Sequence, residues 1–414
     1  MRILHLIHQY PPDYLGGTEL YTQQLAAQLA ARGHDVSIFF RRDGEEACLE
    51  GWREESGVKV WAAVSRPTTS TRRFLATFGD QTLTAALTQV LQESRPDVVH
   101  VQHLMGLPAD LISLLRQQGV PYLVTLHDFW WVCANAQLVT NYSQAVCAGP
   151  RLWLNCARCA LARVGQDALW PLSPALAPLL ALRAARLRAV LQGARRLIAP
   201  TRFVRDLYRG WGLPASLLQV IPHGIALPER MPPRTRPATS GLHVGYVGGI
   251  AWQKGVHVLV EAVNGMPADS VTLSIFGDLS AFPDYARKVQ GMARHDGIHF
   301  AGQIDRQRLW QELVHLDVLV VPSLWYETAA LVIQEAFAAG IPVLASDLGA
   351  LAERVRPGVD GLLFPPGDSA TLRAALLELW RTPEKLMQFS LGIAPVRTIA
   401  DHVDEMETIY NHIL

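Results

Sequence analysis

The chain has 414 residues, of which 50% are hydrophobic, and its 37 basic residues balance its 37 acidic residues. The length predicts two or three domains, and the zero net charge argues against nucleic-acid binding, which needs an excess of basic residues. Prolines interrupt the longest apolar run, residues 168–182, so no segment reaches the roughly 20 apolar residues of a membrane helix. The opening MRILHLIHQY predicts a strand rather than a signal peptide. We therefore expect a cytoplasmic globular protein.

Short β-branched runs alternate with helix-length amphipathic segments along the whole chain, which is typical of doubly wound parallel sheets. In the first half we expect strands at 2–8, 36–40, 97–102, 122–126, 196–199 and 219–222, with helices at 20–31, 109–118, 179–191 and 203–210. In the second half we expect strands at 242–247, 271–276, 298–300, 318–321, 343–345 and 362–364. A dinucleotide oxidoreductase shares this pattern, but no G-x-G-x-x-G follows any of these strands.

These elements predict two Rossmann-like α/β domains that face each other across a cleft. We expect the N-terminal domain at 1–225, with a cysteine-rich insertion at 129–165, and the C-terminal domain at 242–397. The proline-rich segment 226–241 between them is typical of a linker. The last amphipathic segment, 398–414, is predicted to cap the second domain or to cross back to the first.

The charge is unevenly distributed along the chain. Residues 151–236 contain 14 arginines and only three acidic residues. Solvated helix faces account for such a stretch, and so does a basic surface that contacts an anionic membrane or a phosphate-bearing substrate.

One glycine-containing turn follows the first strand of each predicted domain. Gly16 and Gly17 precede a helix, so their backbone amides can approach an anion closely, although a tight turn alone would also need glycine. In the second domain Gly249 precedes Lys254. Arginines outnumber lysines by 33 to 4, so a lysine at this turn indicates a compact ammonium for a phosphate group rather than a solvated surface cation.

Two glutamates follow the predicted strand 318–321. Glu327 lies in the loop at the carboxyl end of this strand, where open α/β sheets bind ligands. Glu335 lies in the next helix, whose first amides near Ala330 and Leu331 are expected to point the same way. A carboxylate accepts two hydrogen bonds, which suits the vicinal hydroxyls of a ribose or hexose. Glu335 has no basic residue near it in the sequence, and an unpaired buried carboxylate is costly, so we expect it to bind a ligand.

These motifs, taken together, resemble those of family-4 retaining glycosyltransferases of the GT-B fold. The resemblance covers nearly the whole chain in the right order. The matching residues are Gly16-Gly17-Thr18-Glu19, His127-Asp128, Ala199-Pro200-Thr201, Val220-Ile221-Pro222-His223-Gly224, Gly248 to Lys254-Gly255, the pair Glu327 and Glu335, and residues Asp360 to Gly367.

The resemblance implies a nucleotide-diphosphate-sugar donor held mainly by the C-terminal domain and a glycan or lipid-linked acceptor held mainly by the N-terminal one. It implies catalytic roles for His127, Glu327 and Lys254. The donor-binding residues would be Gly16, Gly17, Gly249, Lys254, Glu327, Ala330, Leu331 and Glu335, and the acceptor side would have Asp13, Tyr14 and Asp128.

Within the donor site, the resemblance assigns the ribose hydroxyls to Glu335 and the hydroxyls of the transferred sugar to Glu327. Lys254 and the amides of Gly16 and Gly17 would stabilise the diphosphate, and His127 would lie near the reacting carbon. The chain has no Asp-x-Asp pair, which fits a transferase that needs no cofactor and no divalent metal for the diphosphate.

The sequence departs from the family pattern at three places, and one of them, His223 where asparagine is frequent, has no function assigned to it. Gly249 stands where the family commonly has arginine, so one of two cations for the diphosphate is missing. Glu327 is followed by Thr328-Ala-Ala instead of a glycine-rich string, which leaves the donor sugar open.

Four of the five cysteines lie in one 27-residue stretch, which ends in Cys-x-x-Cys. In a reducing compartment this clustering favours a structural zinc site over free buried thiols, and either over disulfides. The expected ligands are Cys133, Cys147, Cys156 and Cys159.

The sequence thus predicts a retaining hexosyltransferase of cell-surface polysaccharide or glycolipid assembly. It would be cytoplasmic, with peripheral contact to an anionic membrane. Two alternatives remain: a nucleotide-sugar epimerase of the same fold, and a catalytically silent nucleotide-sugar-binding module, which the glycine at position 249 favours.

Overall fold

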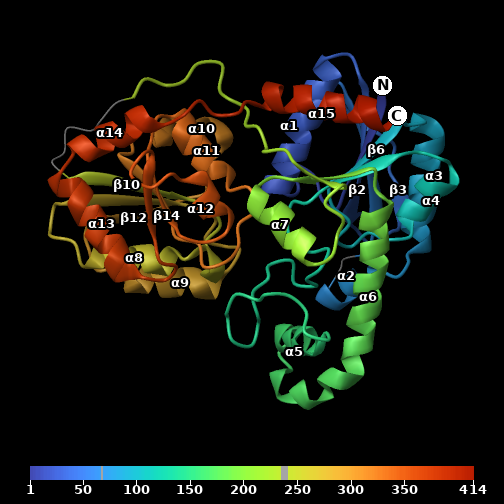
Figure 1. The fold of residues 1–414 in the computed structure, drawn as a ribbon, viewed down its shortest axis with the longest axis horizontal. Coiled ribbons are helices and arrows are strands. Elements are labelled where there is room, and N and C mark those ends of the chain that lie inside the picture. The colour runs from blue at the N-terminus through green and yellow to red at the C-terminus, as the bar shows by residue number, and fades with distance from the viewer. Residues whose placement is uncertain (67–68, 235–240) are drawn as a thin grey trace. The chain divides into compact units, whose positions relative to one another are not determined.

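The structure, a computed structural model, describes residues 1–66, 69–234 and 241–414, so residues 235–240 of the predicted linker lie outside the described part. The chain forms two compact units. Unit 1 comprises Met1–Gly224 together with Ile399–Leu414, and unit 2 comprises Ile225–Thr398. Each unit is built around its own β-sheet (Figure 1).

The sheet of unit 1 has the strand order β3-β5-β2-β1-β6-β7-β8-β9, and β4 also pairs with β5. All neighbours are parallel except β3 and β4, which run antiparallel to β5. Buried aliphatic residues such as Ile3, Val36 and Val98 lie side by side in the central strands. The strands are β1 (Arg2–Ile7), β2 (Asp35–Asp43), β3 (Cys48–Leu49), β4 (Arg53–Glu55), β5 (Val58–Ser65), β6 (Val98–Val101), β7 (Tyr122–Thr125), β8 (Arg196–Ala199) and β9 (Leu218–Val220).

Several helices of unit 1 begin at a side-chain cap. Asp80 accepts the backbone N–H of Leu83, and Thr201 accepts that of Val204, which satisfies amides that a helix start leaves unpaired. The helices are α1 (Gly17–Ala31), α2 (Ser70–Ala76), α3 (Gln81–Ser94), α4 (Leu111–Gln117), α5 (Leu154–Arg163), η1 (Asp167–Leu172), α6 (Ser173–Gly193), α7 (Arg202–Gly210) and α15 (Ile399–Ile413).

Helix α15, at the end of the chain, packs on unit 1. Its His402 lies 2.7 Å from the hydroxyl of Tyr21 in α1, and Tyr410 lies 2.7 Å from His100 in β6. Arg32, just after α1, donates to Asp404 at 2.6 Å. These polar contacts, of which the first two are buried, fix α15 against α1 and the inner strand β6 (Figure 1).

Helix α6 continues through two of the prolines in the apolar run 168–182. Pro174 lies in its first turn, where the missing N–H costs nothing, and Pro178 lies inside the helix. In the described part of the chain, Asp167–Gly193 is the one helical stretch long and apolar enough to cross a membrane by length and composition. Its buried residues, which include Leu180, Leu187 and Val190, recur at helical spacing and pack against unit 1.

Unit 2 contains a fully parallel sheet with the order β12-β11-β10-β13-β14-β15. Its strands are β10 (Leu242–Val247), β11 (Val271–Phe276), β12 (Ile298–Gly302), β13 (Val318–Val321), β14 (Val343–Ser346) and β15 (Gly361–Phe364). Its helices are η2 (Trp252–Lys254), α8 (Val256–Asn264), α9 (Pro283–Met292), α10 (Arg306–Leu313), α11 (Leu331–Ala338), α12 (Ala350–Arg354), α13 (Ser369–Arg381) and α14 (Glu384–Gly392).

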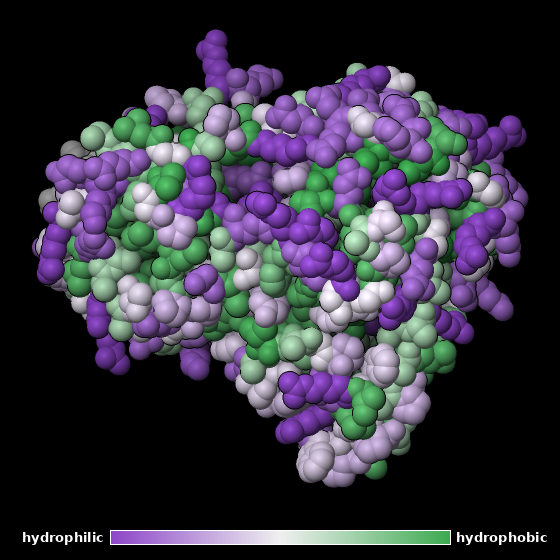
Figure 2. Space-filling model, in the orientation of Figure 1, coloured by the Kyte–Doolittle hydropathy of each residue, from purple (hydrophilic) through white to green (hydrophobic). Residues whose placement is uncertain are grey.

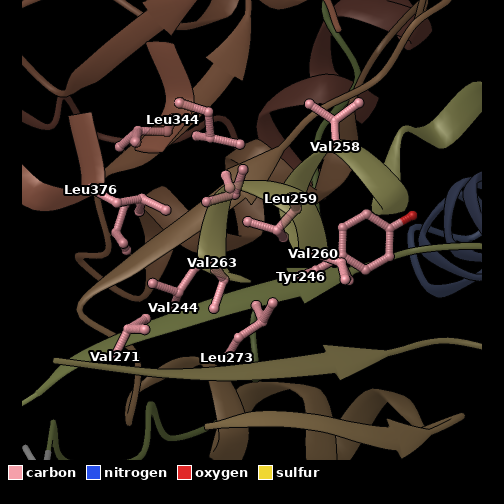
Figure 3. Packing of buried hydrophobic residues seen from close by; sticks show 14 of the residues in the cluster. Val244, Tyr246, Val258, Leu259, Val260, Val263, Val271, Leu273, Leu344 and Leu376 are labelled. Atoms are coloured by element: carbon pink, nitrogen blue, oxygen red, sulfur yellow. The ribbon is translucent and has the colours of Figure 1, made fainter. Parts of the chain in front are cut away.

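The core of unit 2 lies on both faces of this sheet. On one face, Leu259 and Val263 of α8 and Leu376 of α13 pack against Val244 and Leu273 of the central strands (Figure 3). A second cluster, which includes residues of α10 and α11, covers the other face. Because apolar side chains cover both faces, the inner strand β13 is apolar and buried throughout.

The predicted fold class is confirmed, since both units have parallel sheets covered by helices. Strands β3, β4 and β5 were not predicted. Strand β4 is the charged sequence Arg-Glu-Glu, and it pairs with β5 at the edge of the sheet, where a hydrophobic pattern is weakest.

Candidate functional site

In unit 2, two loops leave the carboxyl ends of the neighbouring strands β10 and β13. One loop leads through Gly249 to Lys254, and the other contains Glu327. The backbone N–H of Leu324 donates to the carbonyl of Gln253 at 2.8 Å, which joins the two loops. Parallel strands bring their carboxyl ends to one edge, where ligands of open α/β sheets bind.

Gly255 permits the close approach of these loops. It has φ 70°, and a Cβ built there would lie 1.8 Å from the carbonyl oxygen of Pro322. Only glycine fits this position without a shift of the backbone. Lys254 therefore lies beside the loop of Glu327 because Gly255 follows it in the sequence.

Lys254 and Glu327 form an ion pair. The ammonium Nζ of Lys254 donates to Oε1 of Glu327 at 2.8 Å, and Ser323 Oγ and Trp325 Nε1 donate to the same oxygen, each at 2.8 Å. Lys254 also lies over the ring of Trp325, 5.1 Å from its centroid. Within the described residues all three donors reach Oε1, so Oε2 is the oxygen that remains for a ligand.

The environment keeps Glu327 ionised. Burial on its own would raise the pKa of its carboxyl group, but the charge of Lys254 and the hydrogen bonds from Lys254, Ser323 and Trp325 outweigh burial, and the pKa lies below its ordinary value. The two loops therefore place an ionised carboxylate, Glu327, beside a half-buried ammonium, Lys254.

Glu335 lies in α11 with its side chain 6% exposed. The sequence-based expectation that it has no basic partner is wrong, because Arg306 at the start of α10 forms an ion pair with Oε1 of Glu335. Arg306 is 29 residues away in the sequence, so the neighbours of Glu335 in its own helix gave no sign of it. Glu335 is thus a buried carboxylate held by Arg306. The hydroxyls of a ligand would have to share this carboxylate with the arginine.

Two backbone positions near these side chains are distinctive. Ala330, which precedes α11, has φ 48° and ψ 56°, a left-handed conformation that costs energy for any residue with a Cβ. Leu331 follows as the first residue of the helix. A Cβ on Gly249 would meet nothing within 4 Å, so the structure has room for a side chain at this position.

In unit 1, the turn of Gly16 and Gly17 opens α1, as the sequence predicts. A Cβ on Gly16 would lie 2.4 Å from Oε2 of Glu19, whereas one on Gly17 would meet nothing within 4 Å. Glu19 is buried, and its Oε1 lies 3.4 Å from Nε2 of His8. Burial raises the pKa of Glu19, and backbone hydrogen bonds of Glu19 and Gly16 partly offset the rise. The carboxyl group of Glu19 therefore already occupies part of the helix terminus.

His127 follows β7 and is buried and neutral. Its Nε2 lies 2.8 Å from Oε1 of Gln102, and the amide nitrogen of Gln102 lies 3.1 Å from Nδ1 of His5. With Gln102 in this assigned orientation, His127 carries its proton on Nε2. Burial first, and then the charge of His103, lower the pKa of His127 to about 3 despite nearby Asp128.

Asp128 is held beside His127 by two donors. Nε2 of His103 lies 3.1 Å from both of its carboxylate oxygens, and the backbone N–H of Trp130 donates to Oδ1 at 2.8 Å. Of the other residues predicted on the acceptor side, Asp13 is exposed and Tyr14 is partly buried.

Sequence reasoning missed Arg306, Gln102 and His103, which hold Glu335, His127 and Asp128 in place. Gln102 and His103 directly follow β6, the neighbour of β7 in the sheet. Polar residues at two adjacent strand ends are a signal that could have identified them.

The structure does not support the predicted zinc site. Cys133, Cys147, Cys156 and Cys159 are free thiols that line one cavity of unit 1. Yet in residues 1–66, 69–234 and 241–414 no group of three or more His, Cys, Asp or Glu side chains is arranged to hold a metal ion. Burial, followed by the charges of the other cysteines, raises the pKa of Cys156 to about 12, so the free thiol is protonated.

Comparison with known proteins identifies the family. The model of Glycosyltransferase Family 4 matches residues 15–228. The chain belongs to glycosyltransferase family 4. A second model, Glycosyl transferases group 1, matches residues 241–382 of this glycosyltransferase.

Relatives and solved structures agree with this assignment. The chain is 27% identical to glycogen synthase of Mycobacterium tuberculosis over 407 residues, which cover 92% of this chain and 87% of the relative. It is 27% identical to D-inositol 3-phosphate glycosyltransferase of Xylanimonas cellulosilytica, over 87% of this chain and 84% of the relative. Sucrose-phosphate synthase from Thermosynechococcus elongatus superposes with a TM-score of 0.73 at 21% identity, covering 99% of this chain and 98% of that structure. The fold of this glycosyltransferase is GT-B.

Proposed function

We propose that this glycosyltransferase transfers a sugar, with retention of anomeric configuration, from a nucleotide-diphosphate sugar bound to unit 2. The observation that carries the proposal is the ion pair of Lys254 and Glu327 beside the end of β13. It places a cation for a diphosphate next to a carboxylate whose Oε2 remains for a sugar hydroxyl. The structure of HepE from Anabaena, 19% identical to this chain with a TM-score of 0.67, contains UDP-glucose, which supports a donor of this class.

In the proposed reaction, the bond between the anomeric carbon and the diphosphate oxygen breaks and its electron pair leaves with the diphosphate. The acceptor oxygen forms a bond to the same face of that carbon, and its proton passes to the departing phosphate oxygen. Negative charge therefore develops on the leaving group, where Lys254 stabilises it. Gly249 supplies no second cation, so the backbone amides of this turn and of Gly17 contribute the rest.

His127 serves the transferred sugar in this proposal. Because its pKa is about 3, its ring stays neutral and can hydrogen-bond to a hydroxyl without adding charge beside an oxocarbenium-like carbon. Asp128, Asp13 and Tyr14 serve the acceptor. Glu335 binds the ribose hydroxyls, with Arg306 holding its carboxylate in position.

The proposed acceptor is a growing glycan or a lipid-linked sugar of surface polysaccharide assembly. We place the protein in the cytoplasm, in peripheral contact with the inner face of the membrane. The 14 arginines of residues 151–236 support this placement, because basic residues near anionic lipid contribute about 1 kcal/mol each.

A donor panel tests the enzymatic proposal. UDP-, GDP- and ADP-sugars are assayed with wild-type protein and with Lys254→Ala and Glu335→Ala. We expect one donor class to be turned over, loss of transfer in both variants with an intact fold, and a product with the donor's anomeric configuration by NMR. An inverted product would contradict retention. Conversion of the donor sugar without acceptor would indicate an epimerase, and donor binding without turnover a silent binding module.

Co-sedimentation with vesicles tests the membrane contact separately. The protein is mixed with phosphatidylglycerol or phosphatidylcholine vesicles at low and high salt. We expect sedimentation with the anionic vesicles that is lost at high salt. Equal behaviour with both lipids would contradict an electrostatic contact.

A further inference from the structure

A helical arm extends from unit 1 (Figure 1). We define the arm as residues 151–193, which contain α5, η1 and α6. It exposes large apolar side chains that no other part of the described chain covers, a feature that marks interaction surfaces. These residues are Leu152, Leu154, Val164, Leu169, Trp170, Leu172, Leu179 and Leu182. Figure 2 shows apolar and charged surface side by side on this arm.

The arm is also strongly basic. It contains six arginines and one acidic residue, Asp167, which lies 3.5 Å from Arg158. Apolar side chains next to arginines fit a surface of anionic lipid, into which leucine and tryptophan insert while arginines contact the phosphates.

A cavity of about 330 Å³ lies at the base of this arm. Its walls come from α2, the segments after β6 and β7, α5 and α6. Its apolar lining includes Phe74, Met105, Leu176, Leu179 and Leu180. The volume falls within the range of small-molecule sites, about 300–1,000 Å³. Asn135, Asn141 and Asn155 also line the cavity, but most of its surface is apolar. It therefore suits a hydrocarbon chain better than a sugar, most of whose hydroxyls would lose hydrogen bonds there.

The charged residues around the cavity have one sign. Among the described residues that line it, Arg73, Arg163 and Arg183 are basic and none is acidic. Arg183 is buried, donates to the carbonyl of Trp130 at 2.8 Å and lies 4.7 Å from the centroid of that ring. This excess of positive charge favours a ligand with an anionic headgroup.

Trp130 connects the cavity to the candidate acceptor residues. It lines the cavity, and its backbone N–H donates to Asp128 at 2.8 Å. Its ring lies 5.3 Å from that of His103, which also holds Asp128. A ligand chain in the cavity would therefore end close to the residues proposed to serve the acceptor.

We propose that this cavity binds the hydrocarbon chain of a phosphate-bearing lipid, taken from the membrane that the arm contacts. The identification of this lipid as the acceptor rests on the proposed function, but its binding does not. The arm presents basic and apolar side chains to the bilayer, and the cavity receives one chain at the foot of α6.

Titration with dodecyl phosphate, below the concentration at which it forms micelles, tests this site. Leu179 lines the cavity and Leu182 on the same helix does not, and both are partly exposed, at 39% and 49%. Leu179→Asn and Leu182→Asn therefore form a matched pair with similar expected effects on stability. We expect calorimetric binding to wild-type protein, weakened at least about tenfold by Leu179→Asn and unchanged in Leu182→Asn.

No binding to the wild type, or equal weakening in both variants, would overturn the proposal. Stoichiometric zinc in the purified protein, together with no lipid binding, would also overturn the proposal. The cysteines that line the cavity would then bind a metal instead. Donor binding is measured on the same samples. If donor binding persists while lipid binding fails, only the cavity proposal is contradicted, whereas lipid binding without any donor binding contradicts the proposed function.

Discussion

The ammonium of Lys254 and the carboxylate of Glu327 lie 2.8 Å apart, although 73 residues separate them in the sequence. They meet because β10 and β13 are neighbours in the sheet of unit 2 and because Gly255 lets their loops touch. A cation that is already placed needs no rearrangement when charge develops on a leaving group.

Removal of this ammonium should affect transfer far more than folding. Lys254→Met is expected to lower kcat by about 100-fold or more, because it removes one preorganised charge from the departing diphosphate. Lys288→Met, at an exposed position of α9, is the control and should leave kcat unchanged. Steady-state kinetics with the preferred donor measures both. Equal kcat values in the two variants would contradict the role of Lys254.

A pair of glycines tests the contact of the two loops. Gly255→Ala would place a Cβ 1.8 Å from the carbonyl oxygen of Pro322 at φ 70°, so we expect it to lower the free energy of unfolding by more than about 1 kcal/mol. Gly249→Ala meets nothing within 4 Å and should change this free energy by no more than about 0.5 kcal/mol. Urea denaturation measures both values, and a neutral Gly255→Ala would refute the close approach.

The left-handed conformation of Ala330 can be tested by two glycine substitutions that should change the free energy of unfolding in opposite directions. At φ 48°, Ala330→Gly should raise the free energy of unfolding by up to about 1 kcal/mol, because strain of about 1–2 kcal/mol is relieved while the unfolded chain gains some entropy. Ala336→Gly, inside the same α11, should lower it by about 1 kcal/mol or more. Thermal unfolding of the two variants compares them, and a loss of stability in both would contradict the left-handed conformation at Ala330.

The buried histidines predict how stability depends on pH. Burial lowers the pKa of His5 to about 3 from an ordinary value of 6.5. Between pH 6.5 and 3, His5 therefore binds a proton in the unfolded chain but not in the folded chain. The free energy of unfolding is therefore highest above pH 6.5 and falls as the pH drops toward 3.

Each such histidine contributes a slope of about 1.4 kcal/mol per pH unit within this window. His5→Gln should reduce the slope by about this amount, whatever its effect on stability at pH 7. His412→Gln, at an exposed position of α15, should leave the slope unchanged. Denaturation at pH 7, 6 and 5 measures it, and the same slope in all three proteins would show that His5 is not buried as described.

The apolar strands could be predicted from the sequence because both faces of each sheet are covered. Val318–Val321, for example, is entirely buried and consists only of valine and leucine. Strand β4 could not be predicted, since its charged residues lie at an exposed edge and its pairing with β5 depends on the register of the sheet.

Only those residues of the site that belong to recognisable sequence motifs could be predicted. Lys254 and Glu327 follow strand ends, and the topology brings them together. The partner of Glu335 could not be foreseen, because Arg306 comes from another helix and the sequence does not specify how α10 packs against α11. In the same way, Gln102 holds His127 only because β6 and β7 are neighbours.

The central claim is that unit 2 holds the nucleotide through Glu335 and the diphosphate through Lys254. Calorimetric Kd values for a nucleoside monophosphate and the matching nucleoside diphosphate, measured with wild type, Glu335→Gln and Lys254→Met, test it most directly. We predict that Glu335→Gln weakens both ligands, since both contain the ribose, and that Lys254→Met weakens the diphosphate much more than the monophosphate. If both variants bound both ligands as tightly as the wild type, this account of the donor site would be wrong.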